Sequence, residues 1–281
     1  MQLKKKGISY LLLCGFVLSS AVYASGPTIY KDKHHYKDYK DMPAQSYNHF
    51  EVIGAGGIAK LDAGNGTLGV TSSEKDSLVQ TNSNNWNTQA AQLGVGYIYY
   101  FGHATPYSEN AQWFTSIEPQ VNLYYLASNS INGYVSRFQN PSYSGISFDI
   151  PLHSTRLMLD AALTAVSWRR LSLYGIAGIG EAWNRISYSD SVNNNAGSSC
   201  PNQRVSLGSN TNTNFVWEAG LGLNFEASQR VGVSLEYLYT HLGTVKASGG
   251  GNEGSVTSPV ISSPSFNLKS QTALLGLHIA I

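Results

Sequence analysis

The side chains best suited to acid–base chemistry are four histidines at or near the ends of alternating apolar–polar segments: His103, His153, His241 and His278. A serine nucleophile needs a base within hydrogen-bond reach and a third group that orients this base. Ser154 adjoins His153, but neighbouring residues of a strand point to opposite faces, so these two side chains cannot meet. We therefore expect no catalytic residues and predict that the protein is not an enzyme.

Metal and thiol chemistry have little support in the sequence. The adjacent His34 and His35 lie in Tyr30–Asp41, a run of Lys, Asp, Tyr and His without the ligand spacing of a tetrahedral site. We predict no bound metal and no cofactor. Cys200 is the only cysteine outside the first 24 residues, so an internal disulfide is excluded after signal removal. A bond to another chain and a free thiol both remain open.

A further set of polar residues alternates with apolar ones, as Arg156 and Asp160 do with Leu157 and Leu159. Side chains alternate across a strand, so such residues share one face opposite an apolar face. We predict that eight of them form a polar network inside a barrel: Glu118, Gln120, Asn122, Arg156, Asp160, Glu218, Asn224 and Glu236.

Short alternating strands are the elements that must position these residues. Charged residues make up only 12% of the chain, about half the usual share of a soluble domain. No segment after the first 24 residues is long enough for a spanning helix. We predict eight strands: Tyr47–Leu61, Gln89–Phe101, Trp113–Leu126, Thr155–Val166, Leu171–Trp183, Asn214–Phe225, Val231–Leu242 and Lys269–Ile281.

The connections between these strands alternate in length. Residues 62–88, 127–154, 184–213 and 243–268 are long and rich in Asn, Ser and Gly, whereas 102–112, 167–170 and 226–230 are short. Long external loops and short periplasmic turns are typical of outer-membrane barrels. The pattern predicts an all-β fold, an eight-stranded antiparallel transmembrane up-and-down β-barrel over residues 47–281.

Aromatic residues and the last strand support the same fold. Trp168 and Phe225 lie near short turns, whereas Trp183 and Trp217 lie nearer the long connections. We expect two aromatic girdles, one at each membrane interface. In Thr272–Ile281 every second residue is apolar and the others are small or polar, as in a strand with lipid outside and a polar interior.

The first 24 residues resemble a secretory signal, with a basic start, an apolar core and a small-residue site that predicts cleavage between Ala24 and Ser25. We therefore predict export through the Sec pathway, and we expect residues 25–46 to form a periplasmic leader. Because the signal holds three lysines and no acid, the remainder has 15 basic and 17 acidic residues. This balance gives no reason to expect nucleic acid as a partner.

The chain resembles the small eight-stranded outer-membrane barrels of Gram-negative bacteria, the group that includes the OmpA transmembrane domain and the opacity-type surface proteins. The resemblance rests on Leu93–Tyr97, Tyr174–Gly180, Ala219–Leu223 and the C-terminal strand. It implies a location in the bacterial outer membrane, contact with its lipid and lipopolysaccharide, and insertion by the barrel-assembly machinery. We predict a monomer. Some such barrels modify lipid A, but Tyr237–Leu242 does not match the His-x-Ser pattern of the barrel deacylases.

The interior of an eight-stranded barrel is just wide enough to be filled by side chains. Isolated charges are costly to bury, so we expect Arg156 to pair with one or more of Glu118, Asp160, Glu218 and Glu236. We predict a structural surface barrel with a lumen plugged by this network, whose external loops mediate recognition or adhesion to a host or cell-surface ligand. The alternative is a narrow, weakly cation-selective pore. A lipid A-modifying enzyme is the remote alternative.

Overall fold

A computed structural model gives the fold of most of the chain. It describes residues 48–69, 75–83, 85–102, 104, 107–136, 139–140, 146–192, 205–248, 252–253 and 262–281. The predicted signal and its cleavage site at Ala24 and Ser25, the leader 25–46, His103 and Cys200 lie outside these residues. In the described part no helix is long and apolar enough to cross a membrane.

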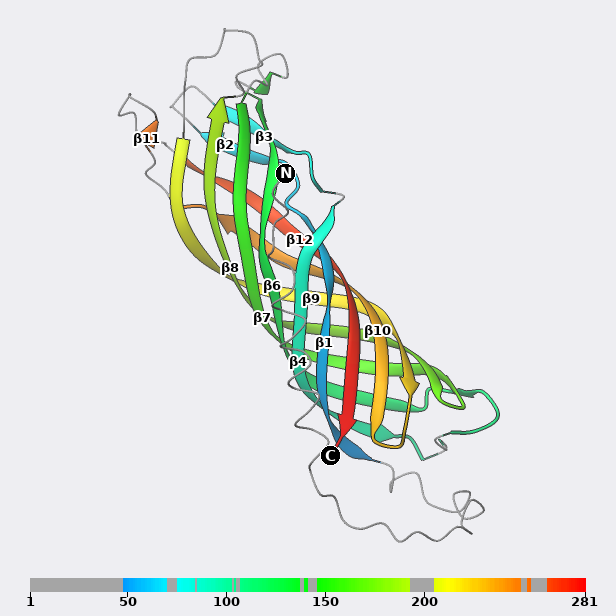
Figure 1. Cartoon of the computed structure of the whole chain (residues 1–281). Coiled ribbons are helices and arrows are strands. Elements are labelled where there is room, and N and C mark those ends of the chain that lie inside the picture. Colours follow the sequence, from blue (N-terminus) through cyan, green and yellow to red (C-terminus); the bar gives the residue numbers. More distant parts are fainter. Residues whose placement is uncertain are drawn as a thin grey trace, which may run out of the picture. The chain divides into compact units, whose positions relative to one another are not determined.

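Eight antiparallel strands form a closed ring, as predicted. Each strand pairs with the next along the chain, and the last pairs with the first, with Glu51 opposite Ala280 and Asp62 opposite Lys269. In Figure 1 the red β12 accordingly lies beside the blue β1. The ring consists of β1 (His49–Asp62), β4 (Trp86–Tyr100), β6 (Ser116–Ser136), β7 (Ile146–Trp168), β8 (Leu171–Val192), β9 (Val205–Glu226), β10 (Val231–Lys246) and β12 (Ser262–Ala280).

The long connections contain more regular structure than predicted. Residues 62–88, expected to be a polar loop, include a hairpin of β2 (Gly66–Gly69) and β3 (Lys75–Gln80). β2 pairs with β12 and β3 pairs with β6, so the hairpin continues the wall above the ends of β1 and β4 (Figure 1). Two short strands lie beside the ring: β5 (Gln112–Trp113) pairs with β7, and β11 (Asn252–Glu253) pairs with β9.

The outer face of the ring is apolar between two levels of aromatic side chains. Leu93, Leu221 and Leu275 are each more than 60% exposed there. On β9, Phe215 and Phe225 are ten residues apart, which corresponds to about 26 Å along the barrel axis at a tilt of about 40°, close to the ~25 Å apolar band of outer-membrane barrels. Exposed aromatics near the short turns are Phe50, Tyr99, Trp113, Phe114, Trp168 and Phe225; near the long connections they are Trp86, Tyr125, Trp183, Phe215, Trp217 and Tyr237.

The interior changes character along the barrel. On β7 the even-numbered side chains from Ile146 to Ala162 point inward, with Phe148 and Ile150 near the long connections and Arg156 and Asp160 further down. Apolar side chains therefore dominate the upper interior, whereas the lower interior combines polar side chains with apolar ones such as Met158, Ile176 and Leu238. The physical reason is the medium outside the barrel. Where water surrounds the wall, apolar side chains are buried inside, whereas where lipid surrounds it, they lie on the outer face.

We call the apolar filling the upper core. Within it the rings of Phe148 and Tyr188, on the neighbouring strands β7 and β8, stack with their centres 6.2 Å apart. Its members come from the β2–β3 hairpin and from seven of the eight ring strands. They are Leu61, Leu68, Leu78, Leu126, Ile131, Val135, Ile146, Phe148, Ile150, Leu152, Ile186, Tyr188, Leu207, Leu242, Val245, Phe266 and Leu268.

Candidate functional site

The eight polar residues predicted for the lumen lie on inward-facing positions of β6, β7, β9 and β10. Glu118 and Asn224 are only partly buried because they border a cavity near the short turns. The other six are buried: Gln120, Asn122, Arg156, Asp160, Glu218 and Glu236. The polar contacts of the lower interior centre on three positions, Arg156, Asp160 and His278, and Tyr124 contacts both of the first two.

The first group surrounds Arg156, which is only 1% exposed. Its Nη2 lies 3.2 Å from Oε2 of Glu218, and its Cζ lies 4.4 Å from the ring centre of Tyr124. Thr240 Oγ1 donates a hydrogen bond of 3.0 Å to the same Glu218 oxygen. Of the four acids expected to pair with Arg156, the described contacts therefore place Glu218 against it.

The second group surrounds Asp160. Asn122 Nδ2 donates to Asp160 Oδ2 at 2.7 Å and to Gln120 Oε1 at 2.8 Å, and the Tyr124 hydroxyl donates to Asp160 Oδ2 at 3.4 Å. The packing depends on Gly178 of the neighbouring strand, because a Cβ there would clash with Asp160 Oδ1. Glycine within a strand often marks such a close approach. The glycine-rich alternation of β8 thus makes room for a polar side chain of β7.

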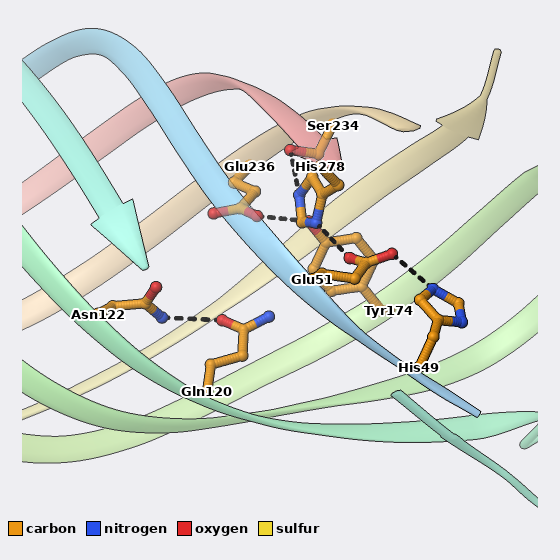
Figure 2. Close-up of polar contacts among 8 residues, drawn as sticks. All are labelled: His49, Glu51, Gln120, Asn122, Tyr174, Ser234, Glu236 and His278. Carbon is orange, nitrogen blue, oxygen red and sulfur yellow. Dashed lines mark hydrogen bonds and ion pairs between the residues drawn. The ribbon is translucent and has the colours of Figure 1, made fainter. Parts of the chain in front are cut away.

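The third group lies closer to the short turns and includes residues that sequence reasoning missed. His278 Nδ1 is 3.0 Å from Glu51 Oε2, and its Nε2 is 3.0 Å from Ser234 Oγ. Glu51 Oε1 is also 3.1 Å from His49 Nε2. Figure 2 shows Glu51 between the two histidines, with Ser234 on the far side of His278. The contacts bring together β1, β10 and β12.

Some signal for this group was present in the sequence. His278 lies on the polar face of the alternating last strand, with Thr272 and Gly276. Its partner could not be identified, because Glu51 is 227 residues away in the chain and the pairing of β1 with β12 brings the two together. The glycine- and alanine-rich β1 also gives a weak indication of which of its faces points inward.

A cavity of ≈ 50 Å³ adjoins this third group. The Tyr174 hydroxyl donates a 2.6 Å hydrogen bond to Glu236 nearby. This volume accommodates a few water molecules or one hydrated ion, and it is too small for a lipid or a peptide. Its polar lining includes Glu51, Glu118, Tyr174, Asn224, Glu226 and His278.

The arrangement of Ser234, His278 and Glu51 has the connectivity of a nucleophile, a base and an orienting carboxylate. A hydrolase also needs room for a substrate carbonyl next to the serine oxygen. Ser234 is 1% exposed and does not line the cavity, whereas His278 and Glu51 do. The geometry therefore suits holding a proton or a cation better than attacking an ester.

Comparison with known proteins identifies the family. Residues 42–261 match the outer membrane protein beta-barrel domain. The chain belongs to this outer-membrane β-barrel family. The apolar outer belt therefore faces the lipid of the bacterial outer membrane, and the short turns lie on the periplasmic side. The narrower resemblance to the OmpA and opacity-type proteins stays a prediction, as does Sec export.

Several solved outer-membrane barrels resemble this one in fold. The outer membrane protease OmpT from Escherichia coli is 7% identical with a TM-score of 0.44, over 83% of this chain and 97% of that one. OprG from Pseudomonas aeruginosa is 15% identical with a TM-score of 0.39, over 83% and 97%. Ail, the attachment invasion locus protein of Yersinia pestis, is 14% identical with a TM-score of 0.35, over 83% and 98%. No curated protein matches the sequence significantly.

Proposed function

We propose that this outer-membrane barrel is a closed surface scaffold whose external connections mediate recognition or adhesion. The upper core is the observation that supports this function most. It fills the barrel beyond the upper aromatic girdle with side chains such as Phe148, Ile150 and Phe266, which offer no polar path to ions. The polar groups around Arg156 and Asp160 fill the lumen below it.

The walls around this core hold the external connections in place. Because the β2–β3 hairpin joins β12 to β6, the paired wall continues above the ends of β1 and β4. Between β9 and β10 the strand pairing ends at Trp217 and His241, and above it the side chain of Asn212 hydrogen-bonds the backbone of Lys246. In the sequence, residues 193–204 and 249–261 follow β8 and β10 and are rich in Asn, Ser and Gly. Binding residues commonly lie on loops that a rigid scaffold positions. The proposed partner is a ligand on a host or neighbouring cell, with lipopolysaccharide around the wall and the barrel-assembly machinery acting during insertion.

Planar-bilayer conductance tests whether the barrel is closed. We expect purified wild-type protein to show no discrete openings, and Arg156→Ala to remain silent because the upper core is unchanged. Openings in the wild type would contradict the closed scaffold. Openings in Arg156→Ala alone would show that the polar network, and not the upper core, closes the lumen.

Loop replacement tests adhesion. Cells producing the wild type are compared with cells in which residues 193–204 or 249–261 are replaced by a short Gly/Ser linker, using attachment to cultured epithelial monolayers as the readout. We expect at least one replacement to abolish attachment while the protein keeps its heat-modifiable migration on gels. A matched control replaces the periplasmic turn 227–230. Attachment unchanged in both loop variants would contradict the proposal.

A narrow, weakly cation-selective pore is the second candidate. The observation in its favour is the ≈ 50 Å³ cavity near the periplasmic turns, whose lining includes three carboxylates, Glu51, Glu118 and Glu226. An acidic lining favours cations. Discrete wild-type openings with a cation-selective reversal potential would support this function. Mass analysis of lipid A from cells with and without the protein tests the remote enzymatic alternative.

A further inference from the structure

The third group of lumenal residues contains a combination of side chains that binds metal ions. One carboxylate oxygen of Glu51, one of Glu118 and one ring nitrogen of His278 all lie within 4.8 Å of one another. All three residues line the ≈ 50 Å³ cavity, so a cation could enter from the periplasmic end and keep water ligands there. We propose that these three side chains form a binding site for one first-row divalent cation such as Zn²⁺.

The distance between two of the ligands fits this proposal. His278 Nδ1 and Glu51 Oε2 are 3.0 Å apart. Two ligands that each bind a tetrahedral Zn²⁺ at about 2.0–2.1 Å lie roughly 3.3 Å from each other. A small outward movement of a few tenths of an ångström would therefore let the cation replace the hydrogen-bonded proton between them.

The third ligand has an unused oxygen. Glu118 Oε1 is buried and has no hydrogen-bond partner in the described part of the chain. A buried carboxylate oxygen without a partner is costly, and a cation bound to the Glu118 carboxylate would offset this cost. Gly96 of β4 makes room for this oxygen, because a Cβ at that position would clash with it.

The surrounding contacts orient the ligands as an outer shell does in metal sites. Ser234 Oγ can accept a hydrogen bond from His278 Nε2, which leaves the lone pair of Nδ1 free for the cation. His49 Nε2 holds the second oxygen of Glu51 at 3.1 Å. Figure 2 shows both contacts on either side of the His278–Glu51 pair.

The charge around His278 also favours a cation. The carboxylates Glu51, Glu118 and Glu236 all act on this histidine electrostatically. Negative charges in a confined, partly dehydrated space repel one another, and a divalent ion offsets two of them. Imidazole with carboxylates suits Zn²⁺ or Mn²⁺ better than Ca²⁺ or Mg²⁺, which prefer oxygen ligands alone.

Titration calorimetry with ZnCl₂ on the purified, EDTA-treated protein in detergent tests the site. We expect one Zn²⁺ per chain, and a loss of affinity of at least tenfold in Glu118→Gln and in His278→Gln. Ser234→Ala should weaken binding by about tenfold, as is usual for outer-shell partners. Asp160→Asn is the matched control, because it removes a lumenal carboxylate outside the site and should leave the affinity unchanged.

Two results would overturn the proposal. One is wild-type affinity in both Glu118→Gln and His278→Gln; the other is loss of binding only when His34 and His35 are replaced, which would identify an adventitious site. X-ray absorption of the Zn²⁺-loaded wild type does not depend on whether a variant folds. We expect one imidazole nitrogen together with oxygen ligands at about 2.0–2.2 Å. A shell with two imidazoles, or with none, would equally contradict the site.

Discussion

Replacing Arg156 by Ala tests how the lumen contributes to stability. The substitution removes a guanidinium that lies 3.2 Å from Glu218 and leaves this buried carboxylate without its counter-charge. At an effective dielectric constant of about 20, two unit charges at this distance attract each other by about 5 kcal/mol. The dehydration of Arg156, relieved in the variant, offsets part of this energy. Removing one partner of a buried ion pair typically costs about 3–5 kcal/mol, and we expect a loss in this range.

Equilibrium unfolding in urea, followed by tryptophan fluorescence in lipid vesicles, measures this loss. Arg185→Ala is the matched control, because Arg185 makes a 3.4 Å contact with Ser209 on the exposed upper wall. Its effect should stay within about 0.5 kcal/mol. Arg156→Ala combined with Glu218→Gln should be more stable than Arg156→Ala alone, since the unpaired charge has been removed.

Two outcomes would refute the reasoning. The first is an Arg156→Ala variant that unfolds within about 1 kcal/mol of the wild type, because the ion pair would then contribute no more than an exposed one. The second is a double variant no more stable than Arg156→Ala, because the cost would then not arise from the unpaired Glu218 carboxylate.

Three further predictions concern other parts of the barrel. Gly178→Ala should destabilise the protein by about 1–3 kcal/mol in the same unfolding assay, because its Cβ would clash with Asp160. Gly56→Ala, where a Cβ meets no atom within 4 Å, should be neutral or stabilising by up to about 1 kcal/mol, and equal effects of the two would contradict the close packing. Phe148→Ala should cost about 3–5 kcal/mol by opening a cavity in the upper core, whereas a loss below about 1 kcal/mol would show that this part is not packed. A fluorophosphonate probe should not label Ser234, and labelling that disappears in Ser234→Ala would show that the buried serine is a reactive nucleophile.

The ring of eight strands could be predicted because lipid imposes a simple rule on the sequence. Apolar residues recur with period two on the exposed face, as Leu93 and Val95 do on β4, and glycine or polar residues such as Gln92, Gly94 and Gly96 occupy the other face. The β2–β3 hairpin was missed because Gly66–Gly69 and Lys75–Gln80 are short segments within a stretch rich in Asn, Ser and Gly. Such a stretch indicates a loop by composition alone. Only the pairing with β6 and β12 makes these segments part of the wall.

The lumenal contacts could be predicted only in part for a different reason. The side of the strand to which each side chain points follows from the local alternation of apolar and polar residues. This alternation places Arg156 and Glu218 in the interior. Choosing Glu218 over Glu118 or Glu236 as the ion-pair partner requires the relative height of strands on different sides of the barrel. The Glu51–His278 contact depends in the same way on closure of the ring between its first and last strands.

The two halves of the barrel are stabilised by different interactions, although the same strands run through both. Above the membrane, Phe148 and Ile150 are buried away from water, so the hydrophobic effect favours that part of the wall. Within the membrane, replacing lipid contacts by protein contacts gives little hydrophobic gain. Hydrogen bonds such as that from Asn122 to Asp160 must therefore determine much of the packing there. On β7 the apolar residues change from the even positions to the odd positions between Leu152 and Leu157. Because the strand continues in the same direction, this switch from even to odd positions indicates where the barrel wall leaves the lipid. The same switch can be sought in the sequences of other barrels whose strands extend beyond the membrane.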